Sequence, residues 1–202
     1  MKPQRQKSKQ KDVAYKITTA ATSEPITRAE AKNWLKLGSD TTDDTLVDTL
    51  ITAARVWVEN HCAISLLPQT ILETWDVLPK DGTLILSIAP LRSVSAVTYL
   101  DTAGVTQTMP ATIYDVDSVS MPARIVRAYG QTWPDTEESV NRASAIYTVG
   151  YDNASAVPAP IKTAMLLTIA DMYDNRTDYV KKMPTAAEYL LQAAGYRLFR
   201  FA

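Results

Sequence analysis

The stretch 151-YDNASAVPAPIKTAMLLTIADMYDNR-176 combines a strong helix start with a helix that has no clear polar face. Pro158 and Pro160 fix φ and lack N–H groups, which suits only the first turn of a helix, so the helix is predicted to begin at about Pro160. A helix that is apolar on most of its circumference is packed by neighbours on several sides. It is too short to cross a bilayer, which takes about 20 apolar residues. Its neighbours must therefore be protein, from this chain or from other copies.

Three other segments also predict helices. Thr27-Arg28-Ala29-Glu30 is a capping box that starts a helix over 27–37, ended by Gly38. The acids of "SDTTDD" favour the start of an amphipathic helix over 43–61. The pattern Thr185-Ala186-Ala187-Glu188 predicts a helix over 185–194, ended by Gly195.

Between residues 70 and 150 the pattern changes to short segments rich in Val, Ile, Thr and Tyr, separated by Pro, Gly or Asp. Strands are expected at 70–78, 83–88, 94–100, 105–109, 113–116, 123–129 and 143–149. The turn 101–104 predicts a hairpin, with Gly104 supplying a positive φ. The fold class is α+β: a small bundle of about four helices with an inserted antiparallel β-domain.

The domain boundaries follow from this order. We expect a flexible basic N-terminal arm at 1–24, a helical connector domain made of 25–68 and 155–195, an inserted β-domain at 69–154, and a C-terminal docking segment at 196–202.

The 202 residues have a formal net charge of −1, which hides an asymmetry. Five cationic residues precede the first acidic residue: Lys2, Arg5, Lys7, Lys9 and Lys11. The rest of the chain therefore carries a net charge of about −6. The negative net charge of the rest of the chain argues against binding to DNA phosphates over a broad surface. The arm itself is a candidate contact for nucleic acid or an acidic partner, with a solvated tail as the alternative. The single cysteine, Cys62, excludes an intramolecular disulfide.

Signals for catalysis are weak. His61 is the only histidine, and no nucleophile or orienting acid is marked for it. The pairs Asp43 with Asp44 and Asp171 with Asp174 are better interpreted as helix-end acids and as a polar edge or subunit contact. Neither a phosphate-binding loop nor metal-ligand spacing occurs. We expect no enzyme, no cofactor and no metal, and we expect the four tryptophans, Trp34, Trp57, Trp75 and Trp133, to serve core or interface packing.

Several segments together resemble a known family. They are "ITRAEAKNWLKL", "DDTLVDTLITAARVWVENHC", "LLPQTILETWDVLP", "LILSIAPLRSVSAVTYLDTAGVTQTM", "IVRAYGQTWP" and the block from "IYTVGY" to "YDNR". In this order they resemble the head-tail connector proteins (adaptor or head-completion proteins) of long-tailed double-stranded DNA bacteriophages. The resemblance covers about residues 24 to 180, and the basic arm has no counterpart in it.

The resemblance implies a structural virion protein. Such proteins form a homo-oligomeric ring, commonly a dodecamer, beneath the portal at the capsid vertex, and DNA passes through it. The implied partners are other copies of the chain, the phage portal protein, a tail-side connector or stopper protein, and genomic DNA, with no membrane. The implied place is the head-tail interface of the virion, after assembly in the host cytoplasm. Two alternatives stay open: a DNA-binding module that uses the basic arm, and a small hydrolase that uses His61.

The C-terminal sequence "GYRLFRFA" interleaves aromatic residues with arginines. Such residues are enriched at interfaces and are unusual on a free end. We predict that it docks onto a neighbouring protein, chiefly the portal, through Tyr196, Arg197, Leu198, Phe199, Arg200 and Phe201. The alternative is that it folds back onto its own helical domain.

Overall fold

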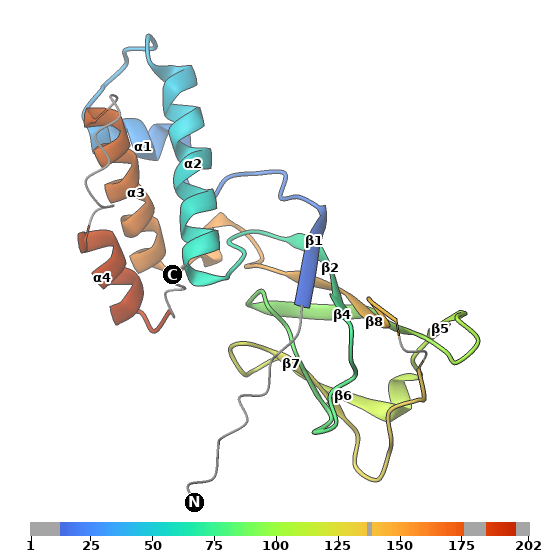
Figure 1. The fold of residues 1–202 in the computed structure, drawn as a ribbon. Coiled ribbons are helices and arrows are strands. Elements are labelled where there is room, and N and C mark those ends of the chain that lie inside the picture. Colours follow the sequence, from blue (N-terminus) through green and yellow to red (C-terminus); the bar gives the residue numbers. More distant parts are fainter. Residues whose placement is uncertain (1–12, 137–138, 176–184, 197–202) are drawn as a thin grey trace, which may run out of the picture. The chain divides into compact units, whose positions relative to one another are not determined.

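The computed structural model describes residues 13–136, 139–175 and 185–196 (Figure 1). In this part of the chain it contains four α-helices and two antiparallel sheets, which confirms the α+β class. The chain divides into two compact units. The described residues within 13–18, 70–87 and 93–148 form the β unit, and those within 19–69, 88–92 and 149–196 form the helical unit. The inclusion of 88–92 in the helical unit was not predicted.

The helical unit contains α1 (Arg28–Leu35), α2 (Asp44–Cys62), α3 (Ala159–Asp174) and α4 (Thr185–Ala193). All four lie close to their predicted positions. α3 packs against each of the other three helices (Figure 1). No described helix combines the length and hydropathy needed to span a membrane.

The helix ends explain these positions. The predicted capping box is present: the Glu30 N–H donates to Thr27 Oγ1 at 3.2 Å, and the Thr27 N–H donates to Glu30 Oε2 at 2.7 Å. α1 ends at Lys36, whose φ of 58° is left-handed, and not at Gly38 as predicted. Gly195, with a φ of 86°, ends α4 as predicted, and the Tyr196 N–H donates to the Leu191 carbonyl.

α3 buries one face rather than its whole circumference. Ile161, Ala164, Met165, Thr168 and Ile169 are buried. Four more large apolar residues are only half-buried at the edge of the core: Leu166, Leu167, Met172 and Tyr173. The prediction of a helix covered on most sides therefore holds only in part, because α1, α2 and α4 leave some of its surface uncovered.

The β unit is built from two sheets. The strands are β1 (Val13–Thr19), β2 (Gln69–Trp75), β3 (Thr83–Ile85), β4 (Leu91–Leu100), β5 (Thr106–Thr108), β6 (Tyr114–Asp117), β7 (Arg124–Arg127) and β8 (Ala143–Val149). Their orders are β1-β2-β8-β4-β5 and β3-β7-β6. Burial alternates along β2 and β8, as expected for strands with one face in a core. The predicted 101–104 hairpin joins β4 to β5, with Gly104 at a φ of 74°.

The N-terminal prediction needs correction. Residues 13–19, assigned to a flexible arm over 1–24, form β1 at the edge of the larger sheet. The Thr18 hydroxyl donates to the Thr70 carbonyl at 3.1 Å, which ties β1 to β2. The alternation of Val13, Tyr15 and Ile17 with smaller or polar residues is a period-two pattern that the compositional interpretation overlooked. Residues 1–12, with all five arm cations, lie outside the described residues.

Candidate interaction surfaces

His61 lies near the end of α2 and is packed between helices. Its ring stacks on Trp57 with centroids 4.9 Å apart, and its Nε2 lies 3.8 Å from Glu188 Oε1 of α4. Within the described residues Nε2 has no hydrogen-bond partner, so no nucleophile is bonded to it. The geometry favours a role in joining α2 to α4 and gives no support to a hydrolase.

The other candidate chemical groups are also engaged in structure. Cys62 is buried, and burial raises the pKa of its thiol to about 12. Asp43 accepts a hydrogen bond from the Tyr173 hydroxyl, and Asp171 accepts from the Asn175 side chain. Among the described residues no three His, Cys, Asp or Glu side chains gather in a way that could hold a metal ion.

The charged residues of α2 lie on one flank, where they meet α1 and the segment before it. Arg28 pairs with Asp44 at 3.1 Å and also with Asp48, and Lys32 pairs with Asp44 at 2.6 Å. Hydrogen bonding to Arg28 lowers the pKa of the Asp48 carboxyl. Arg55 lies between Glu24 and Glu59, at 2.8 and 2.9 Å. These ion pairs hold α2 against α1 and the segment before it, and they leave each charged side chain of this flank paired.

The side of α2 that points away from its buried residues is exposed and carries no charged side chain of its own, and it borders the charged flank at Thr52, whose hydroxyl donates to Glu24 at 3.0 Å. We call it the neutral α2 face; its exposed residues are Thr45, Thr49, Thr52, Ala53, Val56 and Asn60. They recur at helical spacing and stand opposite the buried residues of the same helix. Val56 is the largest apolar side chain on this face, and 43% of its surface is exposed. The charged residues of α2 lie beside this face, and Asp48 keeps 46% of its side chain exposed.

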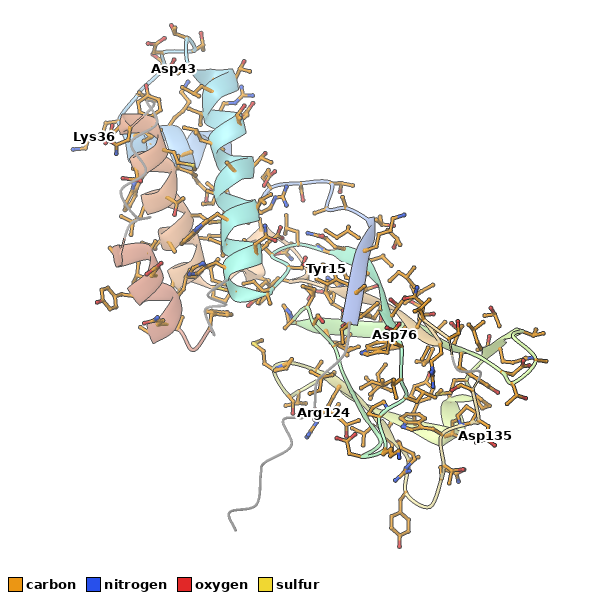
Figure 2. The ribbon with its side chains drawn as sticks, in the orientation of Figure 1. Tyr15, Lys36, Asp43, Asp76, Arg124 and Asp135 are labelled. Atoms are coloured by element: carbon orange, nitrogen blue, oxygen red, sulfur yellow. The ribbon has the colours of Figure 1, made fainter. Side chains whose placement is uncertain are left out.

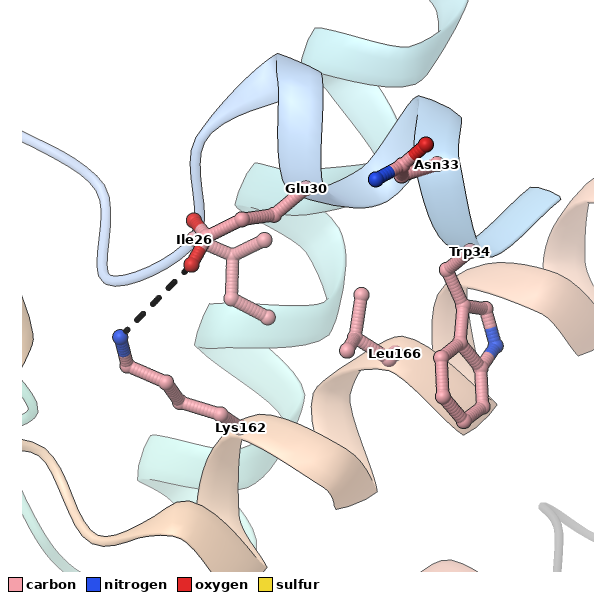
Figure 3. Close-up of a pocket in the computed structure, with 6 residues that line it drawn as sticks. All are labelled: Ile26, Glu30, Asn33, Trp34, Lys162 and Leu166. Carbon is pink, nitrogen blue, oxygen red and sulfur yellow. Dashed lines mark ion pairs between the residues drawn. The ribbon is translucent and has the colours of Figure 1, made fainter. Parts of the chain in front are cut away.

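A pocket lies between α1 and α3, and we call it the α1–α3 pocket (Figure 3). Its volume is about 350 Å³, and it is lined by Ile26, Glu30, Asn33, Trp34, Lys162 and Leu166. Trp34 forms one wall of the pocket and is 44% exposed, so it is not part of the core of its own chain, and only the interface alternative of the tryptophan prediction applies to it. Lys162 Nζ lies 4.0 Å from Glu30 Oε1 across the other end of the pocket (Figure 3). The pocket is apolar in the middle, and its two charges neutralise each other.

The β unit also exposes apolar side chains, but at separate places. Tyr15 and Ile17 are about half exposed on the edge strand β1. Val119 is almost fully exposed in the loop between β6 and β7. That loop is held by Asp117, which accepts hydrogen bonds from the Ser120 hydroxyl, the Val119 and Ser120 N–H groups and Arg124. These bonds hold the pKa of the Asp117 carboxyl well below its usual range.

The predicted docking segment is described only at its first residue. Tyr196 packs against the helical core, and its hydroxyl lies 2.7 Å from that of Tyr151. Tyr196 therefore belongs to its own unit, in line with the fold-back alternative for this residue. Arg197, Leu198, Phe199, Arg200 and Phe201 lie outside the described residues.

Comparison with solved structures gives extensive matches. A chain from the virion of a native gene transfer agent (GTA) particle is 24% identical and aligns with a TM-score of 0.72, covering 93% of this chain and 97% of that one. A chain from the neck of an empty GTA particle, computed with C6 symmetry, is 23% identical with a TM-score of 0.76 and covers 94% and 97%. A chain from the neck of a native GTA particle, computed with C12 symmetry, is 22% identical with a TM-score of 0.67 and the same coverage.

This chain has the fold of those chains. No protein-family model and no curated protein matches the sequence. Because the likeness extends over nearly the full length of both chains, the helical unit and the β unit both have counterparts in the matched structures.

Proposed function

We propose that this chain is a structural neck protein of a phage-like particle, a head-tail adaptor that forms a ring beneath the portal. In this role it joins head to tail and surrounds part of the channel through which DNA passes. The observation that carries the proposal is the near full-length fold likeness to chains of a GTA virion and neck. The C12 symmetry of one of those necks supports a ring of twelve copies.

The surface of the chain supports assembly rather than chemistry. A closed ring is built from head-to-tail contacts, so each subunit needs two unlike surfaces. The helical unit offers the neutral α2 face and the α1–α3 pocket, which differ in shape and composition. The chain after Lys11 carries about −6. Weak repulsion of that kind would let a DNA polyanion slide through a channel instead of binding to its wall.

The C-terminal residues 197–202 supply the portal contact in this proposal. Arg, Leu and Phe are suited to an extended segment that adds main-chain hydrogen bonds and apolar anchors to a partner. The residue before it, Tyr196, is anchored to the helical unit by the hydrogen bond between its hydroxyl and that of Tyr151.

The decisive experiment is microscopy of particles produced without this protein. The proposal expects DNA-filled or leaking heads without tails, and restoration of tailed particles when the gene is supplied in trans. Normal tailed particles in its absence would contradict the proposal.

The alternative of a DNA-binding module has one observation in its favour. The five arm cations directly precede β1, so the arm is joined to a folded strand without a long linker. This function predicts affinity for duplex DNA in the isolated chain, which the adaptor role does not require.

A further inference from the structure

We propose that the neutral α2 face of one copy packs against Trp34 and the α1–α3 pocket of the next copy, and that this contact closes the ring. The inference rests on the proposed function and names the surfaces that carry it out. It commits to a second copy of this chain as the occupant of the pocket.

The first argument is the charge distribution on α2. All the charged side chains in the body of this 19-residue helix, Asp44, Asp48, Arg55 and Glu59, take part in ion pairs inside the helical unit. The outward face therefore presents Thr, Ala, Val and Asn only. Interface cores are depleted of charge, because a charge that loses its water without a partner is destabilising. Covering this face buries no unpaired charge, since Asp48 at its border is paired with Arg28.

The second argument is the anatomy of the α1–α3 pocket. Trp34 is a large aromatic that is nearly half exposed beside an apolar hollow formed with Ile26 and Leu166 (Figure 3). Buried tryptophans beside pockets are the residues that most often carry binding energy. Glu30 and Lys162 pair with each other at the rim, so they need no charged partner from outside. A flat, uncharged surface of short side chains fits such a pocket.

The third argument concerns the identity of the partner. A foreign protein would need only one of these surfaces, whereas a ring needs both on every subunit. The two surfaces match in charge, since neither presents an unpaired cation or anion. They match in shape, because a protruding aromatic requires small side chains opposite it, which the neutral α2 face provides. Both belong to the helical unit, so one type of contact can repeat from copy to copy.

Cysteine pairing between two variants tests the contact directly. Asn33→Cys, which lines the α1–α3 pocket and leaves Trp34 in place, and Val56→Cys are made separately in the full chain, mixed in equal amounts at high concentration and oxidised. The native Cys62 stays in place because it is buried and its pKa is raised to about 12. The matched control replaces Val56→Cys by Val119→Cys, which is more exposed but lies in the β unit.

The expected result is a covalent dimer in the Asn33→Cys and Val56→Cys mixture, at least tenfold more abundant than in either variant alone or in the control mixture. A double variant with both cysteines in one chain should give a ladder of multimers. Dimers formed equally by Asn33→Cys alone would indicate a two-fold contact and overturn the proposal. A mixture that forms no more dimer than the control would also overturn it.

A second set of variants separates this inference from the proposed function. Val56→Arg and Trp34→Ala should weaken self-association about 30-fold or more, while Tyr189→Arg, at an exposed site on α4, should leave it unchanged. Thermal melting of each variant checks the fold. If rings form and attach to heads in all variants, the surfaces are misassigned but the adaptor function stands. If particles lacking the protein are normal, the proposed function fails.

Discussion

Tyr147 of β8 donates its hydroxyl hydrogen to the carboxyl group of Glu73 on β2, and both side chains are completely buried in the β unit. Glu73 also accepts hydrogen bonds from the Ser87 N–H at 3.0 Å and from the Ser87 hydroxyl. Within the described residues no cation is paired with it. Burial raises the pKa of the Glu73 carboxyl, despite the hydrogen bonds that oppose this change.

This relationship predicts a pH dependence of stability. A carboxyl whose folded-state pKa is raised binds its proton more tightly when folded. The stability that this carboxyl contributes is fully present at pH values below its pKa in the unfolded chain. It is lost as the pH rises through its pKa in the folded chain. Urea unfolding between about pH 4 and pH 8 should show a loss of stability toward high pH that is reduced in Glu73→Gln. The exposed Asp115→Asn serves as control, and an unchanged pH profile in Glu73→Gln would contradict the prediction.

The end of α2 offers a stabilising change. Ala63 has a left-handed φ of 50°, a conformation that costs a non-glycine residue about 1 kcal/mol. We expect Ala63→Gly to raise the free energy of unfolding by about 0.5–1 kcal/mol, measured by urea denaturation. Ala53→Gly, on the exposed side of the same helix, should lower it by a similar amount. If both changes destabilise the chain, the assigned helix end is wrong.

A second left-handed residue ends α1. Lys36 lies at the start of the loop to α2, across from Asp43 at its other end (Figure 2). Lys36→Gly should also stabilise by about 0.5–1 kcal/mol. This change is measured as a shift of the urea concentration at the unfolding midpoint, with the slope of the unfolding free energy against urea concentration unchanged. A shift to lower urea would show that the lysine side chain contributes more than its backbone strain costs.

Gly150 occupies a position that no other residue fits. Its φ is 101°, and a Cβ there would lie 2.2 Å from the Leu67 carbonyl oxygen, which is backbone and cannot turn aside. We expect Gly150→Ala to destabilise the chain by at least about 2 kcal/mol. Gly130→Ala, at a φ of 74° with open space around it, should cost only about 1 kcal/mol. Equal effects of the two changes would contradict the steric argument.

The proposed docking role of the C-terminal segment can be tested by truncating the chain. Removal of 197–202 should leave thermal melting unchanged and abolish attachment to heads, since the proposal assigns the contacts of these residues to the portal. Tyr196→Phe should lower stability by about 1 kcal/mol, because the Tyr151 hydroxyl loses its partner. Should removal of 197–202 lower the melting temperature, the segment belongs to its own unit and the portal contact must be sought elsewhere.

Much of the fold could be predicted because its signals are local. The Thr27–Glu30 capping box, the prolines before α3 and the Asp101–Gly104 turn are each encoded within a few residues, and the structure has all three features. β1 was missed because an edge strand takes its stability from a partner far along the chain, here β2.

The interaction surfaces were harder to predict for the same reason. The neutral α2 face becomes visible only when Arg28 and Glu24, from other segments, are seen to pair with the charges of α2. The sequence places Trp34 on a helix, but its exposure depends on how α1 crosses α3. The resemblance of short motifs concerns the class of protein, whereas the contacts between distant segments determine which surfaces are free.

The alternation of the two units along the chain has a consequence for synthesis on the ribosome. α1 and α2 are complete at residue 62, but α3, which covers their apolar side, begins only at residue 159. At a translation rate of about 5–20 residues per second, the helical pair waits about 5–20 s for its partner. During that time Val47, Leu50 and Ile51, which are buried in the finished unit, have no cover from α3. A circular permutant that begins at residue 152, in the exposed stretch after β8, would make α3 before α1 and α2 and would shorten that exposure.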